Sequence, residues 1–153
     1  MISNEWLKEI QELTPQLISW RRYLHQHPEL SFQEKQTAQF VYDTLKSFGN
    51  IELSRPTETS VIGRIRGEQP GPILAIRADM DALPITEQNQ FDFKSINPGV
   101  MHACGHDGHT AILLGVAKLL STKINQLKGE VRLIFQHAEE VFPGGAEELV
   151  EAG

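Results

Sequence analysis

Three short segments of this sequence carry side chains that bind metal ions or transfer protons. They are residues 77–81, with two aspartates, residues 102–109, with three histidines and the single cysteine, and residues 136–140, which end in two glutamates. A thiolate, a neutral imidazole and a carboxylate are ligands that suit zinc and related divalent ions. None of the three segments has a Gly-x-Gly-x-x-Gly or P-loop pattern, which would cradle phosphates. The chemistry that they indicate is that of a metal site.

Cys104 and His106 are the first candidate ligands, because Gly105 lets the backbone between them turn tightly enough for both side chains to face one ion. Their spacing does not match a structural zinc module, which would carry two Cys-x-x-Cys or histidine pairs. A catalytic ion with an open coordination position is therefore favoured. The adjacent Glu139 and Glu140 can divide the remaining work, since one carboxylate can bind the ion while the other takes a proton from water bound to it. Neighbours on an extended segment point in opposite directions, so these two should not share one role.

Each of these residues also has a simpler explanation. A lone cysteine is often a small buried hydrophobe, Asp107 could cap a helix, and Asp79 and Asp81 could form a turn at the end of a strand. Only their gathering in one place would favour the metal site. His25 and His27 lie near a helix end, where packing or capping is the expected role rather than ligation.

Two helices are expected in the first third of the chain. Thr14 and Pro15 form a typical helix start, with a hydroxyl cap before a proline at the first helical position. This helix should run to about Gln26. Ser31 and Glu34 fit a capping box, which predicts a second helix over residues 31–49.

The elements after residue 50 must bring the three segments together. A continuous apolar run at residues 73–76 is typical of a strand buried on both faces. The order from there is strand, loop, helix and strand, which predicts two parallel strands joined by a right-handed crossover. Ligands bind beyond the carboxyl ends of such strands, so the three segments should meet at one edge of the sheet. The expected strands are residues 51–53, 61–65, 73–76 and 131–135, and the expected helices are residues 108–121, capped by Asp107, and 145–151.

The length and composition predict one globular domain, and the element order makes it an α/β domain. The chain has 153 residues, of which 40% are hydrophobic and 22% charged, enough to bury a core. A net charge of −6 gives no reason to expect nucleic acid or an anionic membrane as a partner. The single cysteine excludes an internal disulfide. The longest apolar run, residues 111–117, is too short to span a bilayer, and no signal-peptide pattern follows Met1, so we expect the cytoplasm.

Five stretches of the sequence resemble one known family, the metallopeptidase-related amidohydrolases. This family includes N-acyl-L-amino acid amidohydrolase, hippurate hydrolase, N-acetyldiaminopimelate deacetylase and the auxin-conjugate hydrolases. The resemblance runs from about residue 14 to the final residue, with the motifs in the family's order. The stretches are Leu24-His25-Gln26-His27-Pro28-Glu29-Leu30-Ser31, Arg77-Ala78-Asp79-Met80-Asp81-Ala82-Leu83-Pro84, Met101-His102-Ala103-Cys104-Gly105-His106-Asp107-Gly108-His109, Ala138-Glu139-Glu140, and Gly144-Gly145-Ala146 with Glu151-Ala152-Gly153.

The resemblance implies hydrolysis of the amide bond of an N-acylated amino acid by water bound to a divalent metal, zinc or manganese, with one or two ions in the complete enzyme. It implies a phosphorylase/hydrolase-like zinc-peptidase catalytic domain with a central mixed sheet flanked by helices. By position, Cys104, His106 and Glu140 match metal ligands. Glu139 matches the general base, and Asp79 matches an acidic residue that supports the site by orienting a metal-bound group.

Two departures from the family pattern lead to further expectations. His137 stands where the family usually has proline, and it could loosen the strand end or add a ligand. The resemblance also implies that residues 1–153 are the N-terminal portion of the catalytic domain, without the dimerisation domain, the rest of the catalytic domain and two further histidine ligands. The alternative function is thus a truncated, non-catalytic remnant, and the complete form is expected to be a homodimer. A thiol enzyme with Cys104 as nucleophile is a third interpretation.

Overall fold

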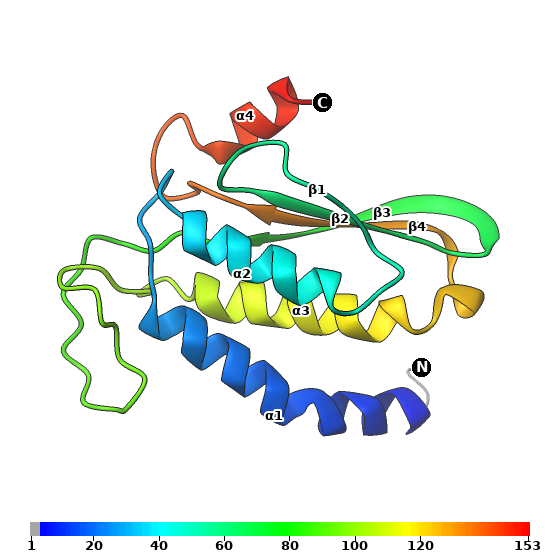
Figure 1. Cartoon of the computed structure of the whole chain (residues 1–153), viewed down its shortest axis with the longest axis horizontal. Coiled ribbons are helices and arrows are strands. Elements are labelled where there is room, and N and C mark those ends of the chain that lie inside the picture. Colours follow the sequence, from blue (N-terminus) through cyan, green and yellow to red (C-terminus); the bar gives the residue numbers. More distant parts are fainter. Residues whose placement is uncertain (1–3) are drawn as a thin grey trace.

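The computed structural model describes residues 4–153, which form a four-stranded sheet with helices on both sides (Figure 1). Helices α2 (Lys35–Lys46) and α3 (His106–Ser121) lie against one face of the sheet. Helix α1 (Asn4–Gln26) packs on α3 as an outer layer, and the short α4 (Gly145–Glu151) lies on the other side of the sheet. The α/β class with a mixed, helix-flanked sheet is therefore confirmed.

The sheet has the strand order β1-β2-β4-β3. Strands β1 (Glu52–Ser54), β2 (Val61–Arg66) and β4 (Lys128–Gln136) pair in an antiparallel manner, whereas β3 (Gln69–Asp79) runs parallel to β4. The predicted strand–helix–strand unit is thus present as β3, α3 and β4. Asp79 pairs with Gln136 in the β3–β4 register, so the candidate site residues that end or follow the two strands lie at the same edge of the sheet.

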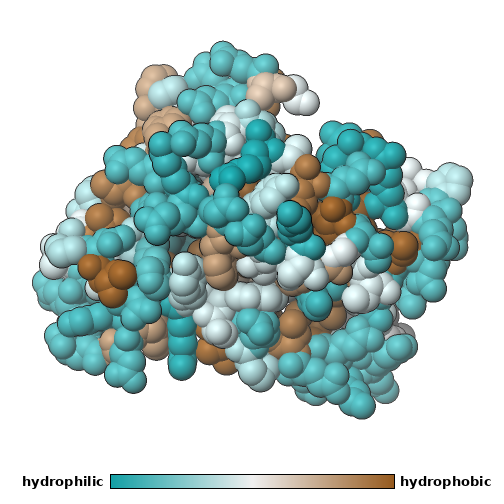
Figure 2. Space-filling view, in the orientation of Figure 1, coloured by the Kyte–Doolittle hydropathy of each residue, from teal (hydrophilic) through white to brown (hydrophobic). Residues whose placement is uncertain are grey.

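The core lies between the sheet and the helices. Alternate residues of β2 and β4 point toward α2 and α3, as the period of a strand requires. The buried apolar side chains of this layer include Leu24, Val41, Leu45, Val61, Ile65, Leu113, Leu114, Leu133 and Phe135. On the face of the molecule shown in Figure 2, hydrophilic residues prevail and hydrophobic ones are scattered. In the described part of the chain, we find no helix with the length and apolar content that a bilayer crossing needs.

The predicted start of the first helix is wrong. Helix α1 begins at Asn4, ten residues before Thr14, and Pro15 lies inside it. Leu13, Leu17, Trp20 and Leu24 repeat at helical spacing through the proline and belong to the core or pack against it. This packing outweighs the hydrogen bond that the proline cannot donate.

The start of the second helix also differs from the prediction. Helix α2 begins at Lys35, and Glu34 before it makes no capping hydrogen bond through its side chain. The carboxylate of Glu29 takes over the capping, accepting hydrogen bonds from the amides of Gln36 and Thr37. The capping box is therefore replaced by a longer-range cap.

Two further expectations about the βαβ unit need correction. Helix α3 begins at His106 behind Gly105, whose φ of 104° is in the left-handed region, so Asp107 lies in the first turn instead of capping it. Strand β3 is not buried on both faces. In the described part of the chain it is an edge strand that pairs with β4. Ile73 and Leu74 are 60% and 57% exposed.

Candidate metal centre

Cys104, His106 and Glu140 meet at the carboxyl edge of the sheet, as the sequence predicts. One ligand atom from each of the three residues lies within 4.8 Å of the others. Cys104 comes from the loop before α3, His106 is the first residue of α3, and Glu140 follows β4. The thiol of Cys104 is exposed, so its interpretation as a buried small hydrophobe is wrong. Three segments that are far apart in the sequence therefore form one group with sulfur, nitrogen and oxygen donors.

His106 is buried and held by Asp81. Its Nδ1 donates to the backbone oxygen of Asp81 at 2.9 Å and lies 3.2 Å from Oδ1 of the same residue. The hydrogen bond with the Asp81 carboxylate raises the pKa of His106 to about 9, against the effect of burial. Because Nδ1 is engaged, Nε2 is the nitrogen that faces Glu139 and Glu140, at 3.8 and 3.9 Å from their carboxylate oxygens.

Asp81 is the residue that the sequence analysis missed. Its Oδ2 accepts hydrogen bonds from the Ser31 hydroxyl at 2.7 Å and from the Glu140 amide at 3.0 Å. Burial raises its pKa, but the hydrogen bonds from His106, the Glu140 amide and Ser31 outweigh it and hold the pKa well below the usual range. Asp81 thereby connects two candidate ligands. The sequence contains no local signal for this, because Asp79 and Asp81 are equally placed at the end of a strand.

Asp79 lies at the end of β3 and takes part in a second group. Its Oδ1 pairs with Arg77, and Asp79, His106 and His109 also have ligand atoms within 4.8 Å of one another. Burial raises the pKa of Asp79. The supporting role predicted for Asp79 stays a prediction, although the residue is close to the site and shares His106 with the first group.

The prediction that Glu139 and Glu140 point in opposite directions is wrong. The strand ends at Gln136, and Ala138 has a φ of 49°, so the alternation of an extended strand does not reach the glutamates. Both carboxylates come within 4 Å of His106 Nε2. Their environments differ, because the Glu139 side chain is 43% exposed and that of Glu140 is 21% exposed.

The donor atoms fit a divalent cation. Within residues 4–153, Oε1 of Glu140 is buried and has no hydrogen-bond partner. A hydrogen bond with Glu140, together with burial and the charges of Glu140, Glu139 and Asp79, raises the pKa of the Cys104 thiol. A cation placed among these groups would pair with the free carboxylate oxygen and favour the thiolate. Sulfur, imidazole nitrogen and carboxylate oxygen form a donor set that zinc accepts.

His137 does not extend this group of ligands. Its side chain is fully buried, and its Nε2 lies 2.9 Å from Oε2 of Glu148 on α4. The ring of Phe32 meets it edge-on. His137 therefore links the end of β4 to α4, and the additional ligand considered from the sequence is not seen.

His25 and His27 lie at the end of the first helix. The packing role predicted from the sequence is seen for His27, whereas His25 is held by two buried carboxylates instead. His25 is buried, with Nδ1 2.6 Å from Asp107 Oδ2 and Nε2 2.9 Å from Glu87 Oε1. His27 stacks on Tyr23. His102 is also buried, and burial lowers its pKa to about 4. Neither of its ring nitrogens has a hydrogen-bond partner in the described part of the chain.

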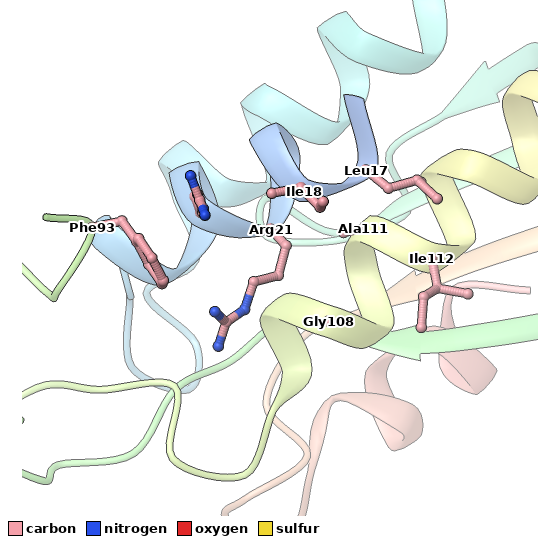
Figure 3. Close-up of a pocket in the computed structure, with 8 residues that line it drawn as sticks. Leu17, Ile18, Arg21, Phe93, Gly108, Ala111 and Ile112 are labelled. Carbon is pink, nitrogen blue, oxygen red and sulfur yellow. The ribbon is translucent and has the colours of Figure 1, made fainter. Parts of the chain in front are cut away.

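A separate pocket of about 430 Å³ lies between α1 and α3 (Figure 3). Its lining is apolar apart from two arginines, and none of the candidate ligands contributes to it. Figure 3 shows Arg21 from α1 and Phe93 from the loop between β3 and α3 at one end of it. The convergent polar groups of the molecule thus lie at the sheet edge and not in this pocket. The pocket is lined by Leu17, Ile18, Arg21, Arg22, Phe93, Gly108, Ala111 and Ile112.

Comparison with known proteins places these observations in a family. The sequence profile of Peptidase family M20/M25/M40 matches residues 75–153. The chain is 64% identical, over all its 153 residues, to an N-acyl-L-amino acid amidohydrolase of Geobacillus stearothermophilus, and covers 41% of that protein. It is 51% identical to an N-acetylcysteine deacetylase of Bacillus subtilis, with 90% of this chain and 36% of that protein covered.

Comparison with solved structures supports the same family. A Bacillus subtilis protein described as a dinuclear metal binding peptidase from the M20 family superposes with a TM-score of 0.88 and 48% identity, covering 94% of this chain and 40% of the other. The chain therefore spans about two fifths of the length of the relatives that it matches.

Proposed function

Because the chain belongs to peptidase family M20/M25/M40, we propose that it is the N-terminal portion of the catalytic domain of a metal-dependent hydrolase that cleaves the amide bond of N-acylated amino acids. The observation that carries this proposal is the convergence of Cys104, His106 and Glu140 within 4.8 Å. The relatives named for hydrolysis of N-acyl amino acids support the substrate class. The remaining length of such relatives would supply the dimerisation domain, the rest of the catalytic domain and further ligands.

Cys104, His106 and Glu140 would hold the ion, zinc or manganese, and two ions are supported by the relative described as dinuclear. When bound, a divalent ion polarises the carbonyl oxygen and lowers the pKa of water. Asp81 fixes the ring of His106 through Nδ1, which keeps Nε2 directed at the site.

Glu139 is the general base in this proposal. Its carboxylate is the more exposed of the pair and lies beside His106 Nε2, so it is open to a substrate and a water molecule. Glu139 would accept the proton of the attacking water and pass it to the leaving nitrogen as the amide bond breaks. Asp79 would support the site from the end of β3.

Metal titration of the purified 153-residue chain tests the ligand assignment. The variants C104S, H106A and E140Q should each bind Co²⁺ or Zn²⁺ at least about tenfold more weakly in calorimetry, because each removes a donor or replaces it with a weaker one. E139Q is the matched control, with affinity within about threefold of the parent, since a general base is not a ligand. Equal binding by all four variants would show that these residues do not form the site.

Activity with N-acetyl- and N-benzoyl-amino acids is measured both in these preparations and in an intact homologous protein, in which the further ligands would be present. Turnover that a chelator abolishes, that zinc or manganese restores and that E139Q lacks is the result expected of the hydrolase. Metal binding without turnover would favour a second candidate, a non-catalytic remnant, which the coverage of only 41% of a relative motivates.

A thiol enzyme is less well supported by the structure. Cys104 is surrounded by carboxylates, and its hydrogen bond with Glu140 raises the pKa of the thiol instead of lowering it. A nucleophilic cysteine requires the opposite environment.

A further inference from the structure

Glu34 is a fully buried acidic residue whose side chain does not serve its own helix. Its exposed fraction is 0%, and it makes no capping hydrogen bond at the start of α2. That end of the helix is capped by Glu29, whose carboxylate accepts hydrogen bonds from the amides of Gln36 and Thr37 at 3.2 and 2.8 Å. Glu34 is therefore available for a partner elsewhere in the molecule.

The partner of Glu34 is the backbone of Ala138, 104 residues away. Oε1 of Glu34 accepts a hydrogen bond from the Ala138 amide at 2.7 Å. Ala138 has a φ of 49°, a left-handed conformation that a residue with a Cβ keeps only when its surroundings hold it there. The oxygen of Ala138 accepts a hydrogen bond from the Gly145 amide at 2.8 Å, so both backbone groups of this residue are engaged.

The turn at Ala138 sets the direction of the chain into Glu139 and Glu140. The segment that contains Glu34 is also connected to Glu140 through a second set of hydrogen bonds. Ser31 donates to Asp81 Oδ2, and the same oxygen accepts the hydrogen bond of the Glu140 amide. Two polar residues before α2 thus hold the turn on both sides.

We propose that Glu34 is a positioning residue for Glu139 and Glu140, whose buried carboxylate keeps Ala138 left-handed and so directs both glutamates toward His106 Nε2. The effect of Glu34 on the backbone of Ala138 does not depend on the function, whereas its importance for catalysis rests on the proposed metal-dependent function. Burial raises the pKa of Glu34 to about 7, against the lowering by the Ala138 hydrogen bond. An interior site is costly for a carboxyl group unless a specific partner compensates, and within residues 4–153 its other oxygen, Oε2, has none.

The first experiment follows the backbone of residues 138–140 by NMR in the metal-free 153-residue chain. In E34A, the amide and Cα signals of these residues should move toward those of an extended backbone. In E34Q they should stay near those of the parent, because the carboxamide oxygen can accept the same hydrogen bond. E29A is the matched control, since it removes the other carboxylate at this end of α2 and should leave residues 138–140 unchanged.

Unchanged signals of residues 138–140 in E34A would overturn the proposal. If E34A does not fold, E34D carries the same expectation, because the carboxylate is retained but is one methylene too short to reach the Ala138 amide. A shift of these signals in E29A as large as in E34A would equally overturn it, since the effect would then come from the helix start.

The second experiment measures Co²⁺ affinity in the same variants. E34A should bind about tenfold more weakly than the parent, with E34Q and E29A within about twofold, as expected when support around a ligand is lost. Equal affinity in E34A and the parent would refute the link between Glu34 and the site. If the parent binds no Co²⁺, the metal-dependent function fails, whereas the NMR result still decides the role of Glu34.

Discussion

The carboxylate of Glu87 connects the long loop between β3 and α3 to helix α1. Replacing Glu87 with glutamine tests how much this connection contributes to the free energy of unfolding. The Glu87 side chain is only 3% exposed. It accepts hydrogen bonds from His25 Nε2 at 2.9 Å and from the Ser95 amide at 2.6 Å, and Asn89 lies within 3.0 Å. His25 in turn bonds to Asp107 on α3. One carboxylate therefore joins the loop to two helices.

The magnitude follows from the ionisation of Glu87. Burial raises the pKa, but the hydrogen bonds from His25, Ser95 and Asn89 outweigh it and lower the pKa from 4.5 to about 2. The difference corresponds to about 3 kcal/mol of folding free energy at pH 7. Because the folded pKa is depressed, this stability is present above pH 4.5 and is lost as the pH falls toward 2. At pH 3 about 1 kcal/mol should remain.

The assay is urea unfolding of the parent and E87Q, followed by circular dichroism at several pH values between 7 and 3. We expect E87Q to be about 2–3 kcal/mol less stable at pH 7, with a difference that shrinks as the solution is acidified. E12Q is the control, because Glu12 forms an exposed pair with Lys8 and should change stability by less than about 1 kcal/mol. A loss of stability in E87Q that is constant across this pH range, or absent at pH 7, would refute the assignment.

Two further predictions concern the site and its supporting loop. D81N should weaken Co²⁺ binding by about 10–100-fold in calorimetry, because the carboxylate that orients His106 is lost; unchanged affinity would contradict the role of Asp81. G145A should lower the free energy of unfolding by about 1–3 kcal/mol in urea titrations, because an added Cβ would lie 2.1 Å from the backbone oxygen of His137. G108A is its control: its Cβ would meet nothing within 4 Å, so a helix gain of about 0.5–1 kcal/mol is expected, and equal losses in both variants would contradict the steric argument.

Much of the fold was predictable from local pattern. The strands, the last two helices and the parallel βαβ unit follow from apolar periodicity and element order, which depend on residues close in sequence. The errors at Thr14 and at Ser31 have a common cause. A capping sequence does not fix where a helix begins when other contacts in the folded chain contribute more stability. For the first helix these contacts are its packing against α3, and for the second they are the hydrogen bonds to Glu29. The exposure of β3 was unpredictable for a related reason, since an apolar strand does not encode which neighbours it will have.

By itself, the sequence determined which side chains are candidate ligands and which family the chain resembles. It also determined the edge of the sheet at which these side chains meet, because a strand–helix–strand order allows few arrangements. Only the tertiary structure decided that Asp81 rather than Asp79 holds His106, that Glu139 and Glu140 approach the same nitrogen, and that Glu34 bonds to Ala138. These contacts join residues 25 to 104 positions apart. They depend on the turn after β4 and on short-range hydrogen-bond geometry, which no pattern of neighbouring residues specifies.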